Sequence, residues 1–383
     1  MKKRVMIYVQ HLLGIGHLVR TARIAQGLAE GPFEVTVVSG GAPVPGISFG
    51  AAQVVQLPPL RSAAGSFAAL LDADGAPLTP AGEAQRAALL LAQFDALRPH
   101  ALLIEMFPFG RRQMRFELLP LLARARAQLP RPLVIASIRD ILQETRKAGR
   151  AEETAALVLS SFDHVLVHGD GVASPLAASF PLADRFADKL VYTGLVGPPP
   201  GGAAAGDHDV IVSAGGGAVG ENLLANALMA RPLTALRDAR WLVITGPNMP
   251  GAAASRLLAL AGERVTLARF VEQLPQRLAG AALSISQAGY NTVADVLSAG
   301  TRSVLVPFAA QGETEQGVRA RGLAQRSRAV CVEEAGLTPG RLAQAIAAAL
   351  ALPAPRANGV QDGVQGGVAA TRAFLERVLK DRC

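Results

Sequence analysis

Cysteine and long apolar runs are both scarce in this sequence of 383 residues. Its two cysteines, Cys331 and Cys383, lie far apart and form no CxxC pair, which argues against a disulfide framework or a zinc site. No apolar run reaches about 18 residues, so the sequence predicts no transmembrane helix. The opening MKKRVMIYVQHLLGIGH has no small-residue cleavage site, and Gln10 and His11 interrupt its apolar run. We therefore interpret it as a first strand rather than a signal peptide, and we expect a cytoplasmic protein.

Aromatic side chains are also few, at 4%, and neither half of the chain has a strong excess of one charge. The first 195 residues carry 20 basic and 16 acidic side chains and the rest carries 18 and 14, so each half is +4. This distribution does not indicate nucleic-acid binding, and an affinity for anionic ligands or for an anionic membrane surface fits equally well. The basic, Leu-rich segment 111–129 could contact the inner membrane peripherally, but such a helix more often packs its leucines on a sheet.

Segments typical of strands and helices alternate along the whole chain. In the N-terminal half we expect strands at 5–9, 33–41, 101–107, 132–140, 164–170 and 189–194, helices at 17–31, 81–99, 111–129 and 153–162, and a less regular segment at 42–80. In the C-terminal half we expect strands at 209–214, 240–245, 264–270, 283–286, 303–307 and 329–332, and helices from about Gly220 and at 252–261, 291–299, 313–324, 338–351 and 368–381.

The proline- and glycine-rich stretch GPPPGGAAAGDHD, which begins at Gly197, interrupts this alternation and is typical of an interdomain linker. Alternating strands and helices predict parallel sheets with crossover helices. The expected fold is therefore α/β, with two doubly wound Rossmann-like domains facing a cleft where ligands bind at the strand ends. We place the domains at 1–196 and 209–367 with a linker at 197–208, and we expect the terminal helix 368–383 to pack back on the first domain.

The first candidate site follows the first strand, where a glycine turn leads into a helix. Gly14 and Gly16 let a ligand approach the backbone, and His17 lies at the helix N-terminus, where free N–H groups favour an anion. A neutral histidine there could act as general base on a hydroxyl, or it could simply complete the turn. Glu105 ends the strand 101–107 and could orient His17 as a catalytic carboxylate does, or it could pair with Arg111 or Arg112.

The second candidate site is the turn SAGGGAVGEN, in which Gly215, Gly217 and Gly220 formally match GxGxxG. A dinucleotide site also needs an acid at the end of the next strand, but that strand ends in Thr245 and Gly246. The turn therefore favours a phosphate cradle over an NAD site, with a tight domain-entry turn as the alternative.

The third candidate site combines polar side chains that follow two neighbouring strands. One group is Ser286, Gln287, Gly289, Asn291, Thr292 and Asp295, and the other is Gln311, Glu313, Glu315 and Gln316. A carboxylate that accepts from two vicinal hydroxyls is a common ribose contact, and amides and acids suit sugar hydroxyls. The alternatives are an Asp295 in the first helical turn that only stabilises the helix dipole, and a solvated helix start around Glu313.

The pieces SAGGGAVG, RFVEQLPQRLAGAALSISQAGYNTVADVLSAGTRSVLVPF and ETEQ resemble the donor-binding domain of family 28 glycosyltransferases. GIGHLVRTARIAQGL resembles that family's acceptor-side loop, while QHLLGIGHLVR, EMFPFGRRQMRFELLPLL and ASIRDIL are similar to a bacterial group of predicted glycosyltransferases. The resemblance implies a glycosyltransferase B fold, a nucleotide-sugar donor such as a UDP-sugar, inversion at the anomeric carbon, no cofactor and no metal ligands.

The resemblance also implies roles for single residues. Asp295 takes the place of the acid that binds ribose hydroxyls, and His17 that of the acceptor-side histidine. Gly216 and Gly217 fall in the diphosphate turn, Ser286 and Gly289 beside the nucleotide, and Glu315 and Gln316 where the donor sugar binds. The Glu–Gln pair and one inserted residue depart from the family pattern and leave the sugar open, and the lipid acceptor is not carried over.

The partners that the resemblance implies are a nucleotide sugar and an acceptor that is a glycan, a lipid-linked compound or a small molecule. Two other functions remain open at this stage. A nucleotide-sugar 2-epimerase shares the fold but needs more acid–base groups than the sequence offers. A non-catalytic nucleotide-sugar-binding protein would not depend on His17, whereas an NAD-dependent oxidoreductase is disfavoured by the missing acids.

Overall fold

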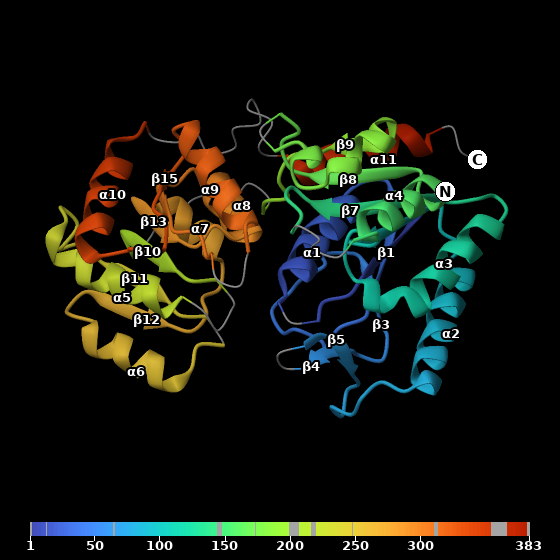
Figure 1. Ribbon diagram of the computed structural model, residues 1–383, viewed down its shortest axis with the longest axis horizontal. Coiled ribbons are helices and arrows are strands. Elements are labelled where there is room, and N and C mark those ends of the chain that lie inside the picture. The colour runs from blue at the N-terminus through green and yellow to red at the C-terminus, as the bar shows by residue number, and fades with distance from the viewer. Residues whose placement is uncertain are drawn as a thin grey trace. The chain divides into compact units, whose positions relative to one another are not determined.

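The computed structural model divides by its contacts into two units, Met1–Val196 with Gly366–Cys383, and Gly197–Gln365 (Figure 1). The structure describes residues 2–12, 14–63, 66–143, 148–172, 174–198, 207–215, 220–246, 248–309, 313–353 and 366–380. Each unit is described by itself. Among the described helices, none combines the length and the apolar character that a membrane span requires.

The first unit is built on a parallel sheet that has seven strands among its described residues. Its order is β3-β2-β1-β6-β7-β8-β9. The strands are β1 (Lys3–Val9), β2 (Phe33–Ser39), β3 (Gln53–Gln56), β6 (Ala101–Glu105), β7 (Leu133–Arg139), β8 (His164–His168) and β9 (Leu190–Tyr192). The chain moves outward from β1 in one direction and then outward from β6 in the other. The carboxyl ends of β1 and β6 therefore form a topological switch point, where ligands of such sheets bind.

Helices cover both faces of this sheet because the residues of each strand alternate between two cores. Met6 and Tyr8 pack with α2 (Pro80–Leu97), α3 (Arg115–Ala127) and α4 (Arg150–Ser161), whereas Val5 and Ile7 pack with α1 (Gly16–Ala29) and α11 (Gly367–Leu379). Helix α11 lies against α1 although the rest of the first unit's N-terminal segment and the whole second unit separate them in the sequence (Figure 1). Short 3-10 segments, η1 (Arg112–Met114), η2 (Leu176–Ala178) and η3 (Pro181–Lys189), complete the unit.

The second unit repeats this plan on a parallel sheet that has six strands among its described residues. Its order is β12-β11-β10-β13-β14-β15, with a switch point between β10 and β13. The strands are β10 (Val210–Ser213), β11 (Trp241–Ile244), β12 (Val265–Ala268), β13 (Leu283–Ser286), β14 (Ser303–Leu305) and β15 (Val330–Cys331). The helices are α5 (Glu221–Ala230), α6 (Gly251–Leu260), α7 (Leu274–Gly280), α8 (Tyr290–Ala299), α9 (Glu315–Gln325) and α10 (Pro339–Ala351), with η4 at Arg231–Leu233.

Two cores also sandwich this second sheet. Val210 and Val212 pack with α5, α6 and α10, and Ile211 between them packs with Leu278 of α7 and Val296 of α8. The two units are thus doubly wound α/β domains, as the alternating sequence pattern predicts.

The structure corrects three details of the sequence reading. The segment 42–80 contains strand β3 and a hairpin of β4 (Arg61–Ala63) and β5 (Ser66–Leu71), and its weak pattern reflects the half-exposed position of β3 at the sheet edge. Helix α7 was not predicted, because it has only seven residues. The expectation that Asp295 lies in the first helical turn is wrong: α8 begins at Tyr290, so Asp295 is its sixth residue.

Candidate functional site

The switch point of the first unit brings His17 and Glu105 together. Tyr8 pairs with Ile104 across β1 and β6, so the chain leaves β1 beside the carboxylate that ends β6. It returns as α1, of which His17 is the second residue, and the N-cap residue Ile15 makes no side-chain hydrogen bond to the helix. The His17 Nδ1 atom lies 3.0 Å from Oε1 of Glu105. Gly14 and Gly16 flank Ile15, and an added Cβ at Gly14 would meet no atom within 4 Å, so the loop leaves open space there.

The charges around this pair fix its protonation. Burial alone would raise the pKa of Glu105, but the Arg20 guanidinium and the His17 ring together lower it to about 2. Burial lowers the pKa of His17 to about 3, and the positive charges of Arg111 and Arg20 contribute. At neutral pH the site therefore contains an ionised carboxylate and a neutral imidazole. Since the carboxylate can only accept, we assign the ring proton to Nδ1, which leaves the lone pair on Nε2.

Arg20 is the member of this site that the sequence analysis missed. Its side chain is 2% exposed, and its guanidinium forms an ion pair with Oε1 of Glu105 and lies 3.2 Å from Nδ1 of His17. The signal was present in the sequence, because a position three residues after His17 lies on the same face of a helix. The alternative partners do not bind Glu105: Arg111 donates to the carbonyl of Gln10 at 2.7 Å, and Arg112 pairs with Glu153.

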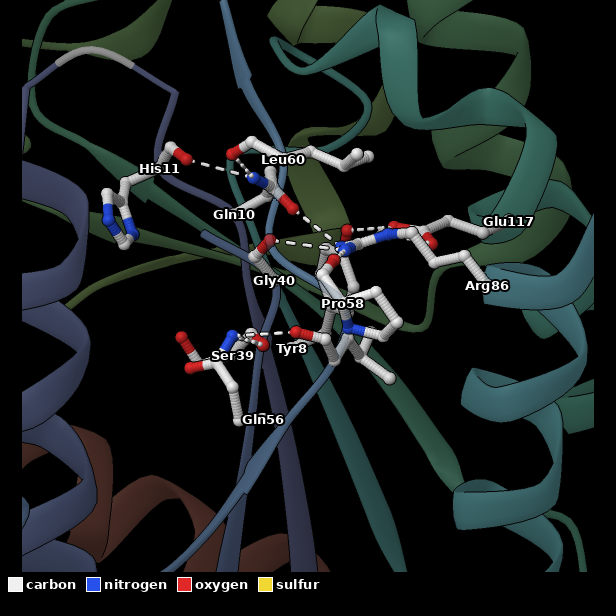
Figure 2. A network of polar contacts seen from close by, with 11 residues as sticks. Tyr8, Gln10, His11, Ser39, Gly40, Gln56, Pro58, Leu60, Arg86 and Glu117 are labelled. Carbon is white, nitrogen blue, oxygen red and sulfur yellow. Dashed lines mark hydrogen bonds and ion pairs between the residues drawn. The ribbon is translucent and has the colours of Figure 1, made fainter. Parts of the chain in front are cut away.

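A second buried polar network supports the loop that carries His17 (Figure 2). Arg86 of α2 is 1% exposed, and its Nε donates to Glu117 of α3 at 2.7 Å while Tyr8 of β1 also donates to Glu117. The Arg86 guanidinium donates to Oε1 of Gln10 at 2.7 Å, and the Gln10 amide donates to the carbonyls of His11 and Leu60. Three elements therefore hold the residues directly after β1 in one arrangement, which limits where α1 can begin.

The switch point of the second unit contains the glycine turn. Gly215 and Gly220 have φ values of 75° and 112°, and a Cβ on Gly220 would collide with Ala214. Both positions therefore require glycine. Gly216 and Gly217 lie outside the described residues. Gly220 is the N-cap residue of α5 and provides no side-chain cap, so the first N–H groups of α5 have no side-chain acceptor from the cap.

Ser286 is the last residue of β13, the central strand beside β10, and Gln287 follows it beside the glycine turn. Gln287 donates its backbone N–H to the carbonyl of Ser213 at 3.3 Å, and its side chain lies within 4 Å of the Cβ positions of Gly215 and Gly220. Both residues are buried, at 0% and 7% exposure. Ser286 Oγ and Gln287 Nε2 have no hydrogen-bond partner among the described residues. Buried polar atoms of this kind are normally satisfied, so a ligand is a suitable partner.

The structure places α9, which begins with Glu315 and Gln316 of the third candidate site, beside the turn that precedes α8, whereas Gln311 lies outside the described residues. Arg319 of α9 donates to the carbonyl of Ala288 at 2.7 Å, and its guanidinium lies 5.7 Å from the ring centroid of Tyr290. Gln316 accepts from the backbone N–H of Phe308 at 3.1 Å, and its amide lies 3.5 Å from Glu313. Arg319 therefore holds α9 against the turn that precedes α8, while Gln316 is fixed against the segment that follows β14.

The remaining residues of this site lie along α8. Gly289 is the N-cap residue in an extended conformation, and Asn291 and Thr292 in the first turn are half-buried. Asp295 is 7% exposed and lies in the second turn, where an interaction with the helix dipole has largely decayed. Within the part of the chain that the structure describes, no group of three or more His, Cys, Asp or Glu side chains is arranged to hold a metal ion.

Comparison with known proteins identifies the second unit. The model of the glycosyltransferase family 28 C-terminal domain matches residues 210–359, which include the donor-side candidates from Gly215 to Gln316. The UDP-N-acetylglucosamine--N-acetylmuramyl-(pentapeptide) pyrophosphoryl-undecaprenol N-acetylglucosamine transferase of Xanthomonas axonopodis pv. citri is 32% identical over 204 residues, which are 53% of this chain and 44% of that protein. The enzyme of the same description from Rhodospirillum centenum is 35% identical over 119 residues, 31% of each chain. The resemblance of the C-terminal half is thus confirmed, although the matches span less than half of these relatives.

Solved structures match over the whole chain. The calicheamicin glycosyltransferase CalG4 has a TM-score of 0.64 at 15% identity and covers 100% of both chains. MurG of Acinetobacter baumannii has a TM-score of 0.61 at 16% identity and covers 98% of this chain and 99% of its own. The glycosyltransferase VinC in complex with DTDP has a TM-score of 0.62 over the same shares. These likenesses show the fold, which is the glycosyltransferase B fold with its two Rossmann-like domains.

Proposed function

We propose that this protein is an inverting, metal-independent glycosyltransferase that moves a hexosyl or N-acetylhexosaminyl group from a nucleotide sugar to an acceptor hydroxyl. The observation that carries the proposal is the His17–Glu105 pair at the strand switch point of the first unit. A neutral imidazole with its Nδ1 bonded to a carboxylate is the group that accepts a hydroxyl proton in acyl and glycosyl transfer. None of the described residues hydrogen-bonds Nε2 of His17, so this nitrogen is available to an acceptor.

In the proposed reaction, Nε2 of His17 takes the hydroxyl proton while the acceptor oxygen bonds to the anomeric carbon. The bond from that carbon to the phosphate oxygen of the donor breaks, and the nucleoside diphosphate leaves. The attack comes from the face opposite the leaving group, so the configuration inverts. Glu105 stabilises the imidazolium that forms, as a carboxylate does in a base–orienter pair.

The leaving diphosphate binds the second unit in this proposal. The N-terminus of α5, which begins directly after Gly220, presents backbone N–H groups to an anion. Fixed N–H donors and a helix dipole stabilise negative charge that develops on a leaving group. These groups supply the stabilisation for which other transferases use a divalent cation, which is why we propose that no metal is required.

The low pKa of His17 fits this cycle if the donor binds first. In the resting protein, burial and the nearby Arg111 and Arg20 lower the pKa of His17 to about 3, which makes it a weak base. The diphosphate of a bound donor adds negative charge near the reacting hydroxyl, and a nearby negative charge raises the pKa of a histidine. The imidazole therefore becomes a stronger base when the donor is in place.

The donor in this proposal is a UDP-sugar. The proposal is supported by the printed name of the relatives, which use UDP-N-acetylglucosamine, while the DTDP bound to VinC makes dTDP the alternative nucleotide. Asp295 would accept from the ribose hydroxyls, and the unpartnered Ser286 Oγ and Gln287 Nε2 would bind the nucleotide. Glu315 and Gln316, with Glu313, would bind the hydroxyls of the sugar.

The acceptor is a compound with a free hydroxyl, and a lipid-linked acceptor at the inner membrane remains one of its classes. The experiment that tests the function offers a panel of UDP- and dTDP-sugars to the purified protein. Binding is measured by calorimetry, and nucleotide release is measured with and without a cell extract as acceptor source. The proposal requires at least one donor that binds and releases its nucleotide faster when the extract is present. A protein that binds none of the donors would contradict it.

A further inference from the structure

Glu105 is bonded on its second oxygen to a chain of side chains that the proposed function does not use. Ser137 Oγ donates to Oε2 of Glu105 at 2.9 Å and lies 3.0 Å from Nε2 of His168. Nδ1 of His168 lies 2.8 Å from Oγ1 of Thr193, which lies 3.1 Å from the carbonyl oxygen of Gly194. The chain crosses the carboxyl ends of β6, β7 and β8 and reaches the residue after β9. Its members are buried, at 2%, 0% and 5% exposure for Ser137, His168 and Thr193.

The register of the sheet explains why these side chains meet. Glu105 and Ser137 are direct partners across β6 and β7, and His168 is the last residue of β8. Thr193 donates its backbone N–H to Val167, so its side chain lies beside His168. Four strand ends therefore place four polar groups in one row, and one end of that row is the carboxylate that faces His17.

Counting the protons available shows which group donates in each hydrogen bond of this side-chain network. The ionised Glu105 can only accept, so the single hydroxyl proton of Ser137 goes to Glu105 and Nε2 of His168 must be the donor to Ser137. Burial and the Arg20 charge lower the pKa of His168 to about 3, so the ring is neutral and has one N–H. Its Nδ1 is then an acceptor, and we assign the single hydroxyl proton of Thr193 to this nitrogen, at 2.8 Å, rather than to the more distant carbonyl oxygen of Gly194, at 3.1 Å. In all three hydrogen bonds the donor lies on the side away from Glu105. Consecutive hydrogen bonds with one direction polarise and strengthen one another in a low dielectric.

We propose that Ser137, His168 and Thr193 are positioning residues that hold Glu105 in the orientation in which its Oε1 bonds Nδ1 of His17. This inference rests on the proposed function, since it concerns the same base. A carboxylate held on one side by Ser137 and on the other by Arg20 cannot turn away from the ring when the ring gains its proton. The chain thereby keeps the proton on Nδ1 and the lone pair on Nε2 before the acceptor arrives.

The test compares two identical substitutions in the same sheet. Thr193→Val removes a hydroxyl that belongs to the chain, and Thr36→Val removes a hydroxyl of similar burial, 3% exposed, in β2 outside it. Ser137→Ala removes the direct bond to Glu105, and Thr193→Ser restores the hydroxyl. We expect kcat for sugar transfer to fall about 3- to 10-fold in Thr193→Val and more in Ser137→Ala, as the loss of one or two hydrogen bonds implies. Thr193→Ser and Thr36→Val should retain the kcat of the wild-type protein.

A pH profile separates positioning from a merely structural role. The charged and titratable groups around the pair are Arg20, Arg111, His17, Glu105 and His168. In Ser137→Ala, Glu105 loses a hydrogen bond to its charged form and holds the His17 proton more tightly, so the acidic limb of kcat/KM should move to higher pH. A structural role would lower the melting temperature without moving this limb.

Nitrogen NMR of the wild-type protein tests the direction of the chain without any variant. We expect His168 to be neutral with its proton on Nε2 at pH 7; a proton on Nδ1, or a charged ring, would overturn the inference. Equal kcat values and equal pH limbs in Thr193→Val, Ser137→Ala and Thr36→Val would overturn it as well. His17→Ala separates this from a failure of the proposed function: if His17→Ala keeps full turnover, the base assignment itself is wrong, whereas an inactive His17→Ala beside a fully active Ser137→Ala contradicts the positioning role alone.

Discussion

His17 and Glu105 lie 3.0 Å apart although 88 residues separate them in the sequence. They meet because β1 and β6 are neighbours at the point where the strand order of the first unit reverses. Among the described residues the second unit has the same strand order apart from the seventh strand, and its glycine turn lies at the corresponding point between β10 and β13. Each unit thus gathers its candidate residues where doubly wound sheets bind ligands.

Replacing Glu105 with Gln tests the pair directly. The amide can donate to Nδ1 of His17, which favours the wrong tautomer and removes the charge that stabilises the imidazolium. We expect kcat to fall by about 10²–10⁴-fold, the range of comparable changes in base–orienter pairs. Glu34→Gln is the matched control, because Glu34 is exposed on β2, and it should retain full activity. An active Glu105→Gln variant would remove Glu105 from the mechanism.

Two histidines with lowered pKa values make stability depend on pH. His17 and His168 have pKa values of about 3 in the folded protein, against an ordinary value of 6.5. Between these values the unfolded chain binds protons that the folded chain does not, so the free energy of unfolding falls as pH falls from 6.5 toward 3. Each histidine contributes a slope of up to about 1.4 kcal/mol per pH unit. Glu105, whose pKa is lowered from 4.5 to about 2, adds a further loss below pH 4.5.

Urea unfolding at several pH values measures this dependence, and His168→Gln isolates one of the two histidines. The variant removes one titrating group, so its stability should change less steeply between pH 6.5 and 4 than that of the wild-type protein. Equal slopes for the two proteins would mean that His168 is protonated in the folded state, contrary to the environment described above.

The pH dependence of the rate should fall off on the acidic side at different pH values for the free protein and for its complex with substrate. The profile of kcat/KM reports groups of the free protein, and that of kcat reports groups of the complex with substrate. Since the resting His17 has a pKa of about 3 and the bound donor raises it, the acidic limb of kcat should lie at higher pH than that of kcat/KM. Identical limbs would show that the donor charge does not reach His17.

Asp295 should matter for donor binding rather than for folding. A carboxylate that accepts from ribose hydroxyls contributes about 1.5–3 kcal/mol, so Asp295→Asn should weaken the nucleotide about 10- to 100-fold by calorimetry. Asp238→Asn is the matched control, because the Asp238 side chain is 88% exposed and lies before β11. If both variants bind the nucleotide as the wild-type protein does, Asp295 is not part of the donor site.

The sequence predicted most of the fold because its strands are short apolar runs and its helices have one apolar face. It also indicated candidate site residues, because polar side chains stand at the carboxyl ends of predicted strands. Examples are Glu105 after LLI and Ser286 at the end of LSIS. It missed Arg20, Ser137 and His168, because nothing local distinguishes a buried arginine in a helix or a serine inside an apolar strand. Their roles depend on which strands become neighbours, which the strand pattern alone does not give.

The position of Asp295 within α8 was also beyond what the sequence could predict. A helix start can be misplaced by one residue when the cap is a glycine without a side-chain hydrogen bond, as Gly289 is. Counted from either start, Asp295 lies beyond the first turn of about 3.6 residues, where a favourable dipole interaction could have explained it. Its burial in the second turn calls for a specific partner instead.

The most direct test of the account is sugar transfer by His17→Ala, measured together with its affinity for the donor. The proposed base predicts that donor affinity stays within about twofold of the wild-type value while kcat falls by about 10²-fold or more. Unchanged kcat in His17→Ala, or a wild-type protein that binds a nucleotide sugar and never transfers it, would contradict the assignment of this protein as a glycosyltransferase with His17 as its base.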